Sequence, residues 1–357
     1  MPVFRGRTAV SASIVGIVLT VLVGAGCGGS SSSRLDAERT VPPASAPTTP
    51  TTTGPERYDP YAGTAAAVPA VGSTTEGRIR TADGRDRRYR LYVPASLPQG
   101  TVPLLVALHG GLGSSAQFAT NSGFDGLAEA NGFVVVYPDG VGGLPNGTGP
   151  QTWNGGYCCG AATRLGVDDV GFVEQLLDLL ARDLPVDPAR IFAAGHSNGA
   201  ILAYRLACEL GDRIAAIGVQ AGSLGVDTCT PARPVSVFHL HGTADTNHPI
   251  DGGTGSGVSG VAFRPARTAV EALAAADGCT PTPVLGTDPA NPDLAVETWS
   301  GCRAGTQVRL VAVTGASHAW MGRAAASPGA AALVGEPYPG LDASRAIWSF
   351  LTAHPRR

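Results

Sequence analysis

Apolar runs alternate with amphipathic stretches from about residue 76 to the end of the chain. Continuous apolar runs at 102–108 and 133–137 predict strands that are buried on both faces. Residues 118–130, between them, have helical spacing. Further along the chain, similar patterns predict strands at 190–194, 215–220, 235–240 and 308–313 and helices at 172–180, 198–209, 268–275 and 342–353. This alternation predicts an α/β fold with a mostly parallel central sheet and helices on both faces.

Two shorter alternating segments precede the first apolar run. They lie at 77–80 and 88–93, with Asp83 and Gly84 between them. An Asp-Gly pair between alternating segments is typical of a β-hairpin. We expect this hairpin at one edge of the sheet.

The first 27 residues have the features of an export signal. Arg5 and Arg7 precede a short apolar run at 9–23, which is too short to span a bilayer comfortably. Small residues and then Cys27 follow this run, which resembles the lipobox at which bacterial lipoproteins are cut and acylated, although Gly24 stands where leucine is usual. We therefore expect an exported protein held at the outer side of the cell membrane by lipid on Cys27, or a secreted protein if Cys27 is not acylated.

Composition separates a tether from a catalytic domain. Residues 28–75 are rich in Ser, Thr, Pro and Ala and contain few large apolar residues, so they are predicted to be a disordered tether. Residues 76–357 are predicted to be the catalytic domain. The whole chain of 357 residues is 43% hydrophobic and has a formal net charge of −3. Its 25 Lys and Arg residues are scattered, which argues against a nucleic-acid partner.

The cysteines indicate disulfides, because an exported chain folds in an oxidising compartment. Apart from Cys27, six cysteines remain, at positions 158, 159, 208, 229, 279 and 302. Cys279 and Cys302 flank a short segment and are the most natural pair. Cys158 and Cys159 are adjacent, so we expect them to reach Cys208 and Cys229 rather than each other, with the connectivity open. No spacing typical of zinc ligands is present, and no metal is expected.

A Gly-x-Ser-x-Gly pattern carries the candidate nucleophile. Gly195 and Gly199 flank Ser197, at the junction of a predicted strand and a predicted helix. In this context the pattern is typical of a sharp turn that exposes the serine, and side chains at the two glycines would collide with the strand and the helix. Ser197 is the predicted nucleophile, and the amide of Asn198 is expected to face a developing oxyanion.

A serine nucleophile needs a base and an acid, which follow it along the chain in this type of fold. Asp245 comes just after the strand predicted at 235–240 and is the expected acid, with Asp251 as the substitute. His318 comes after the strand predicted at 308–313 and is the expected base. His248 shares the loop of Asp245 and His354 lies near the end of the chain, so neither suits that role.

The segment after the first buried strand offers the second half of an oxyanion hole. Its glycines let backbone amides approach a substrate oxygen, and we assign the amide of Gly111 as the partner of Asn198. His109 is expected to have a structural role in this loop. His239 and His241 alternate on a strand, but no third ligand lies nearby to form a metal site.

Seven runs in this order resemble the polyhydroxybutyrate depolymerase-like, feruloyl and acetylxylan esterase group of α/β-hydrolases. They are Leu108-His109-Gly110-Gly111, Tyr137-Pro138-Asp139-Gly140, Trp153-Asn154 through Cys158-Cys159-Gly160, Val167-Asp168-Asp169-Val170-Gly171-Phe172, the Ser197 pattern, His241-Gly242-Thr243-Ala244-Asp245 and His318-Ala319-Trp320. The resemblance implies the α/β-hydrolase fold, the triad already chosen, no metal, and hydrolysis of esters in or on polymers. The family often has Trp-Pro-Gly after its histidine, whereas Met321 and Gly322 follow Trp320 here, so the substrate rim is expected to differ.

Two aromatic residues and two carboxylates remain as candidates. Trp153 and Trp320 lie on predicted active-site loops and are expected to line the substrate cleft. Asp168 and Asp169 precede a predicted helix and are expected to cap it.

The sequence thus predicts an exported serine carboxylic ester hydrolase that works without a cofactor. Its expected substrates are polymer-linked esters or their fragments, such as feruloyl or acetyl esters of xylan or hydroxybutyrate esters. One alternative is an acyltransferase of the mycolyl-transfer kind, which would use the same triad and pass the acyl group to a sugar. A second is a non-catalytic lipoprotein with the same fold.

Overall fold

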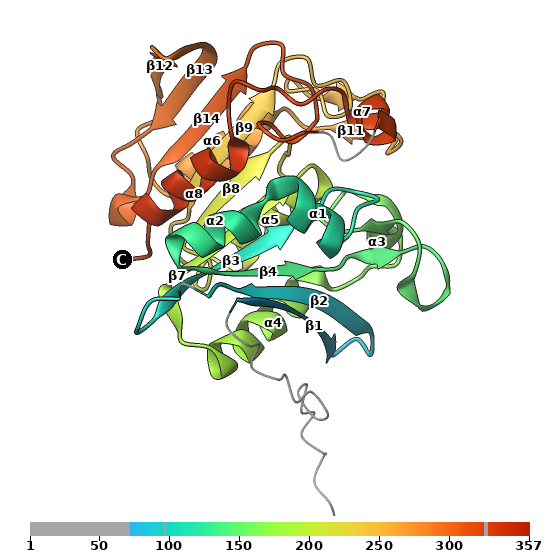
Figure 1. Cartoon of the computed structure of the whole chain (residues 1–357). Helices are drawn as coiled ribbons and strands as arrows, with labels where there is room; N and C mark the ends of the chain where they lie inside the picture. Colours follow the sequence, from blue (N-terminus) through green and yellow to red (C-terminus); the bar gives the residue numbers. More distant parts are fainter. Residues whose placement is uncertain (1–71, 96, 325–327) are drawn as a thin grey trace, which may run out of the picture. The chain divides into compact units, whose positions relative to one another are not determined.

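A ten-stranded sheet lies at the centre of the computed structural model, which describes residues 72–95, 97–324 and 328–357 (Figure 1). The order of the strands across the sheet is β1-β2-β4-β3-β7-β8-β9-β14-β13-β12. The six strands from β4 to β14 in this order are parallel to one another, and the strands outside them are antiparallel to their neighbours. Their bounds are β1 Ser73–Arg80, β2 Asp86–Val93, β3 Val102–Leu108, β4 Val134–Pro138, β7 Val186–His196, β8 Ala216–Gln220, β9 Ser236–Gly242, β12 Val284–Asp288, β13 Asn291–Trp299 and β14 Val308–Val313. The prediction of a mostly parallel central sheet is confirmed.

The predictions for the N-terminal segment fall mainly outside this part of the chain. The export signal, Cys27 and almost all of the predicted tether lie outside the described residues. Within them, β1 starts at Ser73, although the tether was predicted to reach residue 75. Ser73 pairs with Val93 of β2, because an edge strand can keep polar side chains in solvent while its backbone pairs. The β1–β2 hairpin forms one edge of the sheet, as the alternating segments predict.

Helices cover both faces of the sheet and enclose one hydrophobic cluster on each. The helices α4 (Asp169–Asp183), α5 (Asn198–Glu209) and α6 (Ala266–Ala276) pack on one face. The helices α1 (Ser115–Ser122), α2 (Phe124–Asn131) and α8 (Ala343–Ala353) pack on the other. Leu104 and Val106 of β3 belong to the first cluster and Leu105 and Ala107 to the second. A parallel strand between two helical layers is apolar on both faces, which explains its continuous apolar run.

The helix predicted at 118–130 is two helices, α1 and α2. Gly123 separates them with a φ of 63°, and its amide donates to the carbonyl of Ala119. Glycine adopts this left-handed conformation without a Cβ clash and is common where a helix ends. The apolar spacing continues across the break because both helices cover the same face.

The hairpin of β12 and β13 at the other edge of the sheet was not predicted. Val284 and Leu285 of β12 are 67% and 73% exposed, and Pro292 and Asp293 interrupt β13, so neither strand is a continuous apolar run. Strand β13 nevertheless pairs with β14 over six residue pairs. The remaining short elements are α3 (Gly160–Arg164), α7 (Pro328–Val334), β5 (Val141–Gly142), β6 (Gln151–Thr152), β10 (Gly253–Thr254), β11 (Ala262–Phe263) and the 3-10 turns Pro145–Gly147 and Arg303–Gly305.

The parallel strands bring the candidate site residues together at the carboxyl ends of the central strands. Ser197 follows β7, Asp245 follows β9 and His318 follows β14, while the glycine loop follows β3. In open α/β sheets, sites form where the carboxyl ends of parallel strands meet. A search of the described ranges for a helix long and apolar enough to cross a bilayer found none.

Candidate active site

Ser197 occupies a sharp turn between β7 and α5. Its φ of 54° and ψ of −119° lie in a region that residues other than glycine rarely adopt. A Cβ on Gly195 would collide with the carbonyl of Gly199, and a Cβ on Gly199 would collide with the carbonyl of Leu108. The two glycines therefore let α5 start against β3 and β7, and the close packing keeps Ser197 in a conformation that costs about 1–3 kcal/mol.

Asp245 and His318 form a buried hydrogen-bonded pair. The Nδ1–H of His318 donates to Oδ2 of Asp245 at 2.7 Å. The other oxygen, Oδ1, accepts from the amides of Asn247 at 2.9 Å and His248 at 2.8 Å. Burial alone would raise the pKa of Asp245, but the hydrogen bond from His318, with the other contacts, lowers it below its usual value. The contact with His318 distinguishes Asp245 from the substitute acid, Asp251.

Hydrogen bonds connect the loop that carries His318 to neighbouring strands. The sequence alone did not predict this role for the residues that make them. The Nε2–H of His196 donates to the carbonyl of His318 at 2.8 Å, and the Gln220 amide donates to the carbonyl of Ala319 at 2.9 Å. Burial lowers the pKa of His196 to about 3, so this ring is neutral at physiological pH. The signal available in the sequence was Gln220, a polar residue at the end of an apolar strand.

Gly111 and Asn198 lie close together beside Ser197. A Cβ on Gly111 would lie 3.6 Å from Cβ of Asn198, and one on Gly110 would lie 3.5 Å from Cβ of Ser197. No residue in the described ranges accepts a hydrogen bond from the amide of Gly111 or of Asn198. Amides free in this way can donate to a substrate oxygen.

Ser197 and His318 both line one cavity of about 1320 Å³. Gly111, Asn198 and Trp320 are also in its wall. Three large apolar side chains at the cavity are exposed, at 51% for Leu112, 76% for Val258 and 62% for Leu333. Among the described residues, no Asp or Glu lines the cavity. The polar side chains of its wall include those of Gln117, Asn121, Tyr157, Thr163, Arg164 and Asn247.

Comparison with known proteins places this arrangement in a family. The family model described as Esterase PHB depolymerase matches residues 87–280, which is more than half of the chain. The chain belongs to this esterase family. The match includes Ser197 and Asp245 and ends before His318.

Several curated relatives of this chain have related names. Feruloyl esterase B of Piromyces equi is 33% identical over 224 residues, which are 61% of this chain and 39% of the relative. Putative esterase NocK of Nocardia uniformis subsp. tsuyamanensis is 33% identical over 246 residues, covering 66% of this chain and 65% of the relative. The bifunctional acetylxylan esterase/xylanase XynS20E of Neocallimastix patriciarum is 28% identical over 238 residues, covering 66% and 31%. The match thus spans less than two thirds of the length of each of these relatives.

A solved structure supports the fold of this chain. The acetyl xylan esterase from Aspergillus awamori superposes with a TM-score of 0.52 at 16% identity, covering 69% of this chain and 94% of that one. This likeness and the sheet topology show the α/β-hydrolase fold that the sequence predicts.

Trp153 does not line the cavity, contrary to the sequence prediction, whereas Trp320 does. Trp153 is fully buried, and its indole nitrogen donates to the carbonyl of His109 at 2.8 Å. Nε2 of His109 accepts from the amide of Gly140 at 3.0 Å, so the hydrogen of this ring is on Nδ1. Burial lowers the pKa of His109 to about 4, which agrees with the expected structural role. The prediction failed for Trp153 because the loop turns its indole under the glycine loop instead of toward solvent.

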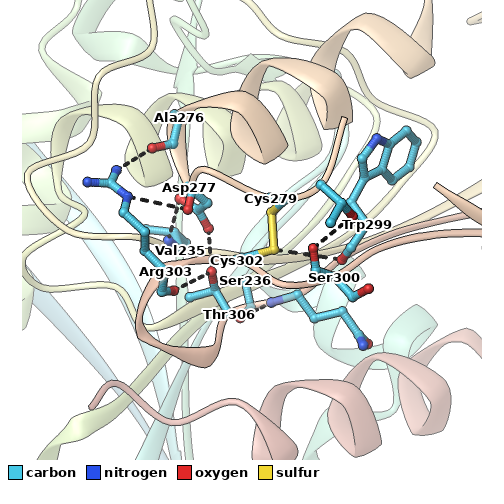
Figure 2. The surroundings of a disulfide bond; sticks show 12 residues. Val235, Ser236, Ala276, Asp277, Cys279, Trp299, Ser300, Cys302, Arg303 and Thr306 are labelled. Atoms are coloured by element: carbon cyan, nitrogen blue, oxygen red, sulfur yellow. Dashed lines mark hydrogen bonds between the residues drawn. A yellow bond between two sulfur atoms is a disulfide. The ribbon is translucent and has the colours of Figure 1, made fainter. Parts of the chain in front are cut away.

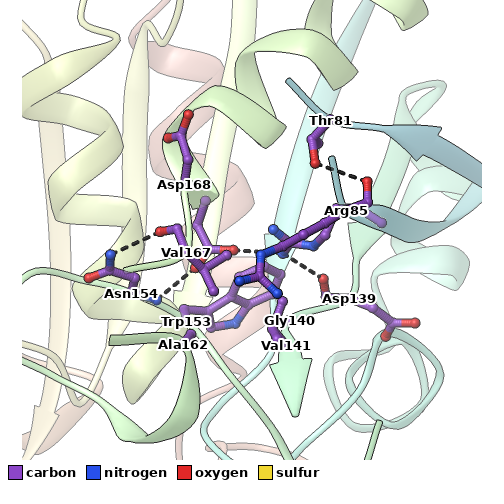
Figure 3. A network of polar contacts seen from close by, with 12 residues as sticks. Thr81, Arg85, Asp139, Gly140, Val141, Trp153, Asn154, Ala162, Val167 and Asp168 are labelled. Atoms are coloured by element: carbon purple, nitrogen blue, oxygen red, sulfur yellow. Dashed lines mark hydrogen bonds and ion pairs between the residues drawn. The ribbon is translucent and has the colours of Figure 1, made fainter. Parts of the chain in front are cut away.

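The two neighbouring aspartates have different partners. Asp168 caps α4, as predicted, by accepting from the amide of Gly171 at 2.9 Å. Asp169 is fully buried and accepts from Arg87 at 2.6 Å and from the amide of Asn154 at 2.7 Å. The capping prediction for Asp169 is therefore wrong, because the side chain points into the core and pairs with a distant arginine. Figure 3 shows the loop next to it, where the Asn154 side chain donates to the carbonyl of Val167 beside Trp153.

The disulfides correct one predicted pairing. Cys279 pairs with Cys302, as their spacing predicts, but Cys208 pairs with Cys229, and Cys158 pairs with its neighbour Cys159. The expectation that Cys158 and Cys159 reach Cys208 and Cys229 is wrong. These two adjacent cysteines pack with Ile201 near the start of α5, and Cys208 lies seven residues further along that helix. Seven residues of helix span about 10 Å, whereas the Cα atoms of a disulfide lie within about 7 Å.

Proposed function

We propose that this chain is a serine carboxylic ester hydrolase that acts through an acyl-enzyme. One relationship carries the proposal. Ser197 is held at a φ of 54° on the wall of the same cavity as His318, whose Nδ1–H donates to Oδ2 of Asp245 at 2.7 Å. A serine on a strained turn, a base in the same cavity and a buried carboxylate behind that base are the parts of nucleophilic acyl transfer.

The site residues have distinct roles in the proposed reaction. Nε2 of His318 takes the proton of Ser197 as its Oγ attacks the ester carbonyl, and the amides of Gly111 and Asn198 hold the oxyanion that forms. Collapse of this intermediate passes the proton from His318 to the leaving alcohol. Water, deprotonated by His318, then attacks the acyl-enzyme and releases the acid. Asp245 stays ionised throughout and stabilises the transient imidazolium.

Replacing the nucleophile tests the proposal. We expect Ser197→Ala to lower kcat on p-nitrophenyl acetate by at least about a thousandfold, because no other group replaces the serine. A fluorophosphonate probe should label the wild-type protein at Ser197 and fail to label the variant. Ser259→Ala is the matched control, because Ser259 also lines the cavity and its loss should leave labelling intact. If Ser197→Ala kept more than about a tenth of the activity, the assignment would be wrong.

We further propose that the substrates are esters linked to polymers or to polymer fragments. Relatives named as feruloyl and acetylxylan esterases support this, and so does a cavity of about 1320 Å³, larger than a typical small-molecule site of about 300–1,000 Å³. The exposed Leu112, Val258 and Leu333 suit the apolar part of an aromatic acid or a polyester. Activity on acetylated xylan, methyl ferulate and short hydroxybutyrate oligomers, compared side by side, identifies the acyl group. Equal and low kcat/KM on all three would contradict this substrate class.

Export and lipid anchoring complete the proposal. They rest on the apolar run at 9–23 and on Cys27. An alkynyl fatty acid fed to expressing cells should label the wild-type chain and not Cys27→Ser. The wild-type chain should also sediment with membranes, and the variant should be released into the medium. Release of both chains to the same extent would contradict the anchor.

A further inference from the structure

Behind Asp245, three buried side chains form a line of hydrogen bonds that the proposed mechanism does not use. Tyr204 of α5 contacts Nδ1 of His239 at 2.7 Å, and Nε2 of His239 contacts Nδ1 of His241 at 3.0 Å. Nε2 of His241 then contacts the carbonyl of His248 at 2.8 Å. All three side chains are fully buried. The line therefore runs from the core helix to the loop that carries Asp245.

The carbonyl at its end fixes the direction of every bond in the line. A carbonyl only accepts, so Nε2 of His241 carries the hydrogen. A neutral His241 then accepts at Nδ1, which requires the hydrogen of His239 on Nε2 and leaves its Nδ1 to accept from the hydroxyl of Tyr204. Burial lowers the pKa of both histidines, well below the usual value for His239, so both rings are neutral at physiological pH.

The end of the line is in contact with the proposed acid. Nε2 of His241 lies 3.6 Å from Oδ2 of Asp245, the oxygen that accepts from His318. The amide of His248 donates to the other oxygen, Oδ1, at 2.8 Å. The backbone of His248 therefore connects the two side chains. Its carbonyl accepts from His241, and its amide donates to Asp245. Asp251, His318, His248 and His196 also act on His241 electrostatically.

We infer that Tyr204, His239 and His241 are positioning residues, which orient Asp245 toward His318 by fixing the hydrogen of His241 on Nε2. This inference rests on the proposed role of Asp245. With the hydrogen on Nδ1 instead, a bare ring nitrogen of His241 would face the carbonyl of His248 and the carboxylate of Asp245. The repulsion would move the loop and lengthen the bond between Asp245 and His318.

A direct test reads the hydrogen positions in the wild-type protein and does not depend on activity. Long-range ¹H–¹⁵N spectra of protein labelled with ¹⁵N-histidine distinguish the two neutral forms and the protonated form of each ring. Signals are assigned by their loss in His239→Gln and His241→Gln. We expect both rings to be neutral with the hydrogen on Nε2 at pH 7. A hydrogen on Nδ1 of either ring, or a protonated ring, would overturn the inference.

A kinetic test separates positioning from general packing. Tyr204→Phe removes one hydroxyl that is remote from the cavity, and we expect kcat to fall about threefold to tenfold, as for the loss of one hydrogen bond, with KM within twofold. The matched control is Tyr137→Phe, which removes another buried hydroxyl, one that donates to Asp125 at 2.7 Å and has no link to Asp245. Equal kcat in the two variants would overturn the inference.

Variants at the end of the line give the larger effect. His241→Phe keeps a ring but loses the donor, and kcat should fall about thirtyfold or more, because the carbonyl of His248 is left unpaired. His241→Gln keeps an N–H near the position of Nε2 and should recover most of this loss. Fluorophosphonate labelling of Ser197 in the wild-type protein reports the proposed function separately. If labelling succeeded while His241→Phe and His241→Gln had equal kcat, the positioning role would be wrong and the esterase assignment would stand.

Discussion

The indole nitrogen of Trp153 donates to the backbone carbonyl of His109 at 2.8 Å and thereby links two loops that border the cavity. The backbone of Trp153 is held by Asn198, whose side-chain oxygen accepts from its amide at 2.7 Å and whose nitrogen donates to its carbonyl at 3.0 Å. His109 starts the glycine loop after β3, and Asn198 starts α5. The two amides proposed to bind the oxyanion, those of Gly111 and Asn198, are therefore connected through one buried residue.

This link predicts that Trp153→Phe lowers kcat more than it changes KM. The variant keeps an aromatic ring but loses the donor to His109, so the glycine loop gains freedom while the cavity wall is unchanged. We expect kcat on p-nitrophenyl acetate to fall about threefold to thirtyfold, with KM within twofold, because the proposed contact of the Gly111 amide with the oxyanion forms mainly in the transition state. Trp299→Phe, at a buried tryptophan of β13 outside the cavity, is the control and should keep both constants. A raised KM at normal kcat would show that Trp153 contacts substrate.

The close packing around Ser197 predicts that one added methyl group strongly destabilises the fold. The Cβ of Gly199→Ala would collide with the carbonyls of Leu108 and His109. The first carbonyl ends a central strand, and the second lies in the loop after it and accepts from the indole of Trp153. Neither can move away freely, and we expect a loss of about 3 kcal/mol or more in the free energy of unfolding. Gly126→Ala is the matched control, because its Cβ in α2 meets nothing within 4 Å. That variant should be about 0.5–1 kcal/mol more stable than the wild type. Urea denaturation of both variants measures the difference.

The parts of this molecule that the sequence predicts are those whose signal is local. The strand at 102–108 is apolar throughout because helices cover both faces of the sheet there. The residues of this segment alone therefore indicate a strand that is buried on both faces. Ser197 is recognisable because the turn requires glycines at 195 and 199 in the sequence itself. Asp245 and His318 were chosen by chain order, because each follows a strand of the same parallel sheet, and their side chains hydrogen-bond to each other.

The parts that were not predicted depend on residues far apart in the chain. Trp153 was expected in the cleft, but its burial depends on His109, 44 positions away. The partner of Asp169, Arg87, is 82 positions away. Cys208 was assigned to the wrong partner because the length of α5, and not the spacing of the cysteines, decides what it can reach. The same limit applies to Tyr204 and His239, which are 35 positions apart.

The buried pair of Arg87 and Asp169 predicts unequal effects of single and double replacement. Asp169 also accepts from the amide of Asn154, the residue after Trp153, so the pair supports the loop beneath the oxyanion site. Both side chains are almost fully buried, at 3% and 0% exposure. We expect Arg87→Met to lower the free energy of unfolding by about 3–5 kcal/mol, because an unpaired carboxylate stays in the core.

Adding Asp169→Asn should recover part of this loss, since the amide oxygen can still accept from Asn154 while the charge is gone. Chemical denaturation of the two single variants and the double variant gives the coupling energy. Additive effects would contradict a direct interaction. Arg80→Met is the matched control, because Arg80 pairs with Asp86 at the surface, where both side chains are more than 60% exposed. Its loss should change stability by less than about 1 kcal/mol.

The carboxyl group of Asp277 predicts a pH-dependent contribution to stability. Figure 2 shows it near the Cys279–Cys302 disulfide, with hydrogen bonds to Val235 and Thr306. It accepts from the amide of Val235 at 3.2 Å and from the hydroxyl of Thr306 at 2.8 Å. Burial is the largest influence and outweighs these bonds, so the pKa of Asp277 is raised from 3.8 to about 6. The folded chain therefore holds this proton at a pH at which the unfolded chain has released it.

The sign of the effect follows from this proton. The stabilising contribution is complete below about pH 4 and is lost as the pH rises through about 6, because the unfolded state then binds fewer protons than the folded state. Asp277→Asn keeps an acceptor for Val235 and cannot ionise. We expect the variant to gain stability relative to the wild type as the pH rises from 4 to 7. A shift of about two pKa units corresponds to about 3 kcal/mol, which is the upper bound for that gain.

Denaturation of wild type and variant at each pH measures this gain and removes a competing effect. Burial lowers the pKa of His109 to about 4 and of His196 to about 3, so these groups make the fold less stable as the pH falls below about 6.5. Both proteins contain them, and the difference between the two curves isolates Asp277. Asp227→Asn is the control, since it removes a carboxylate whose side chain is 91% exposed. A difference for Asp277→Asn that stays constant from pH 4 to 7 would show that Asp277 does not hold its proton in the folded state.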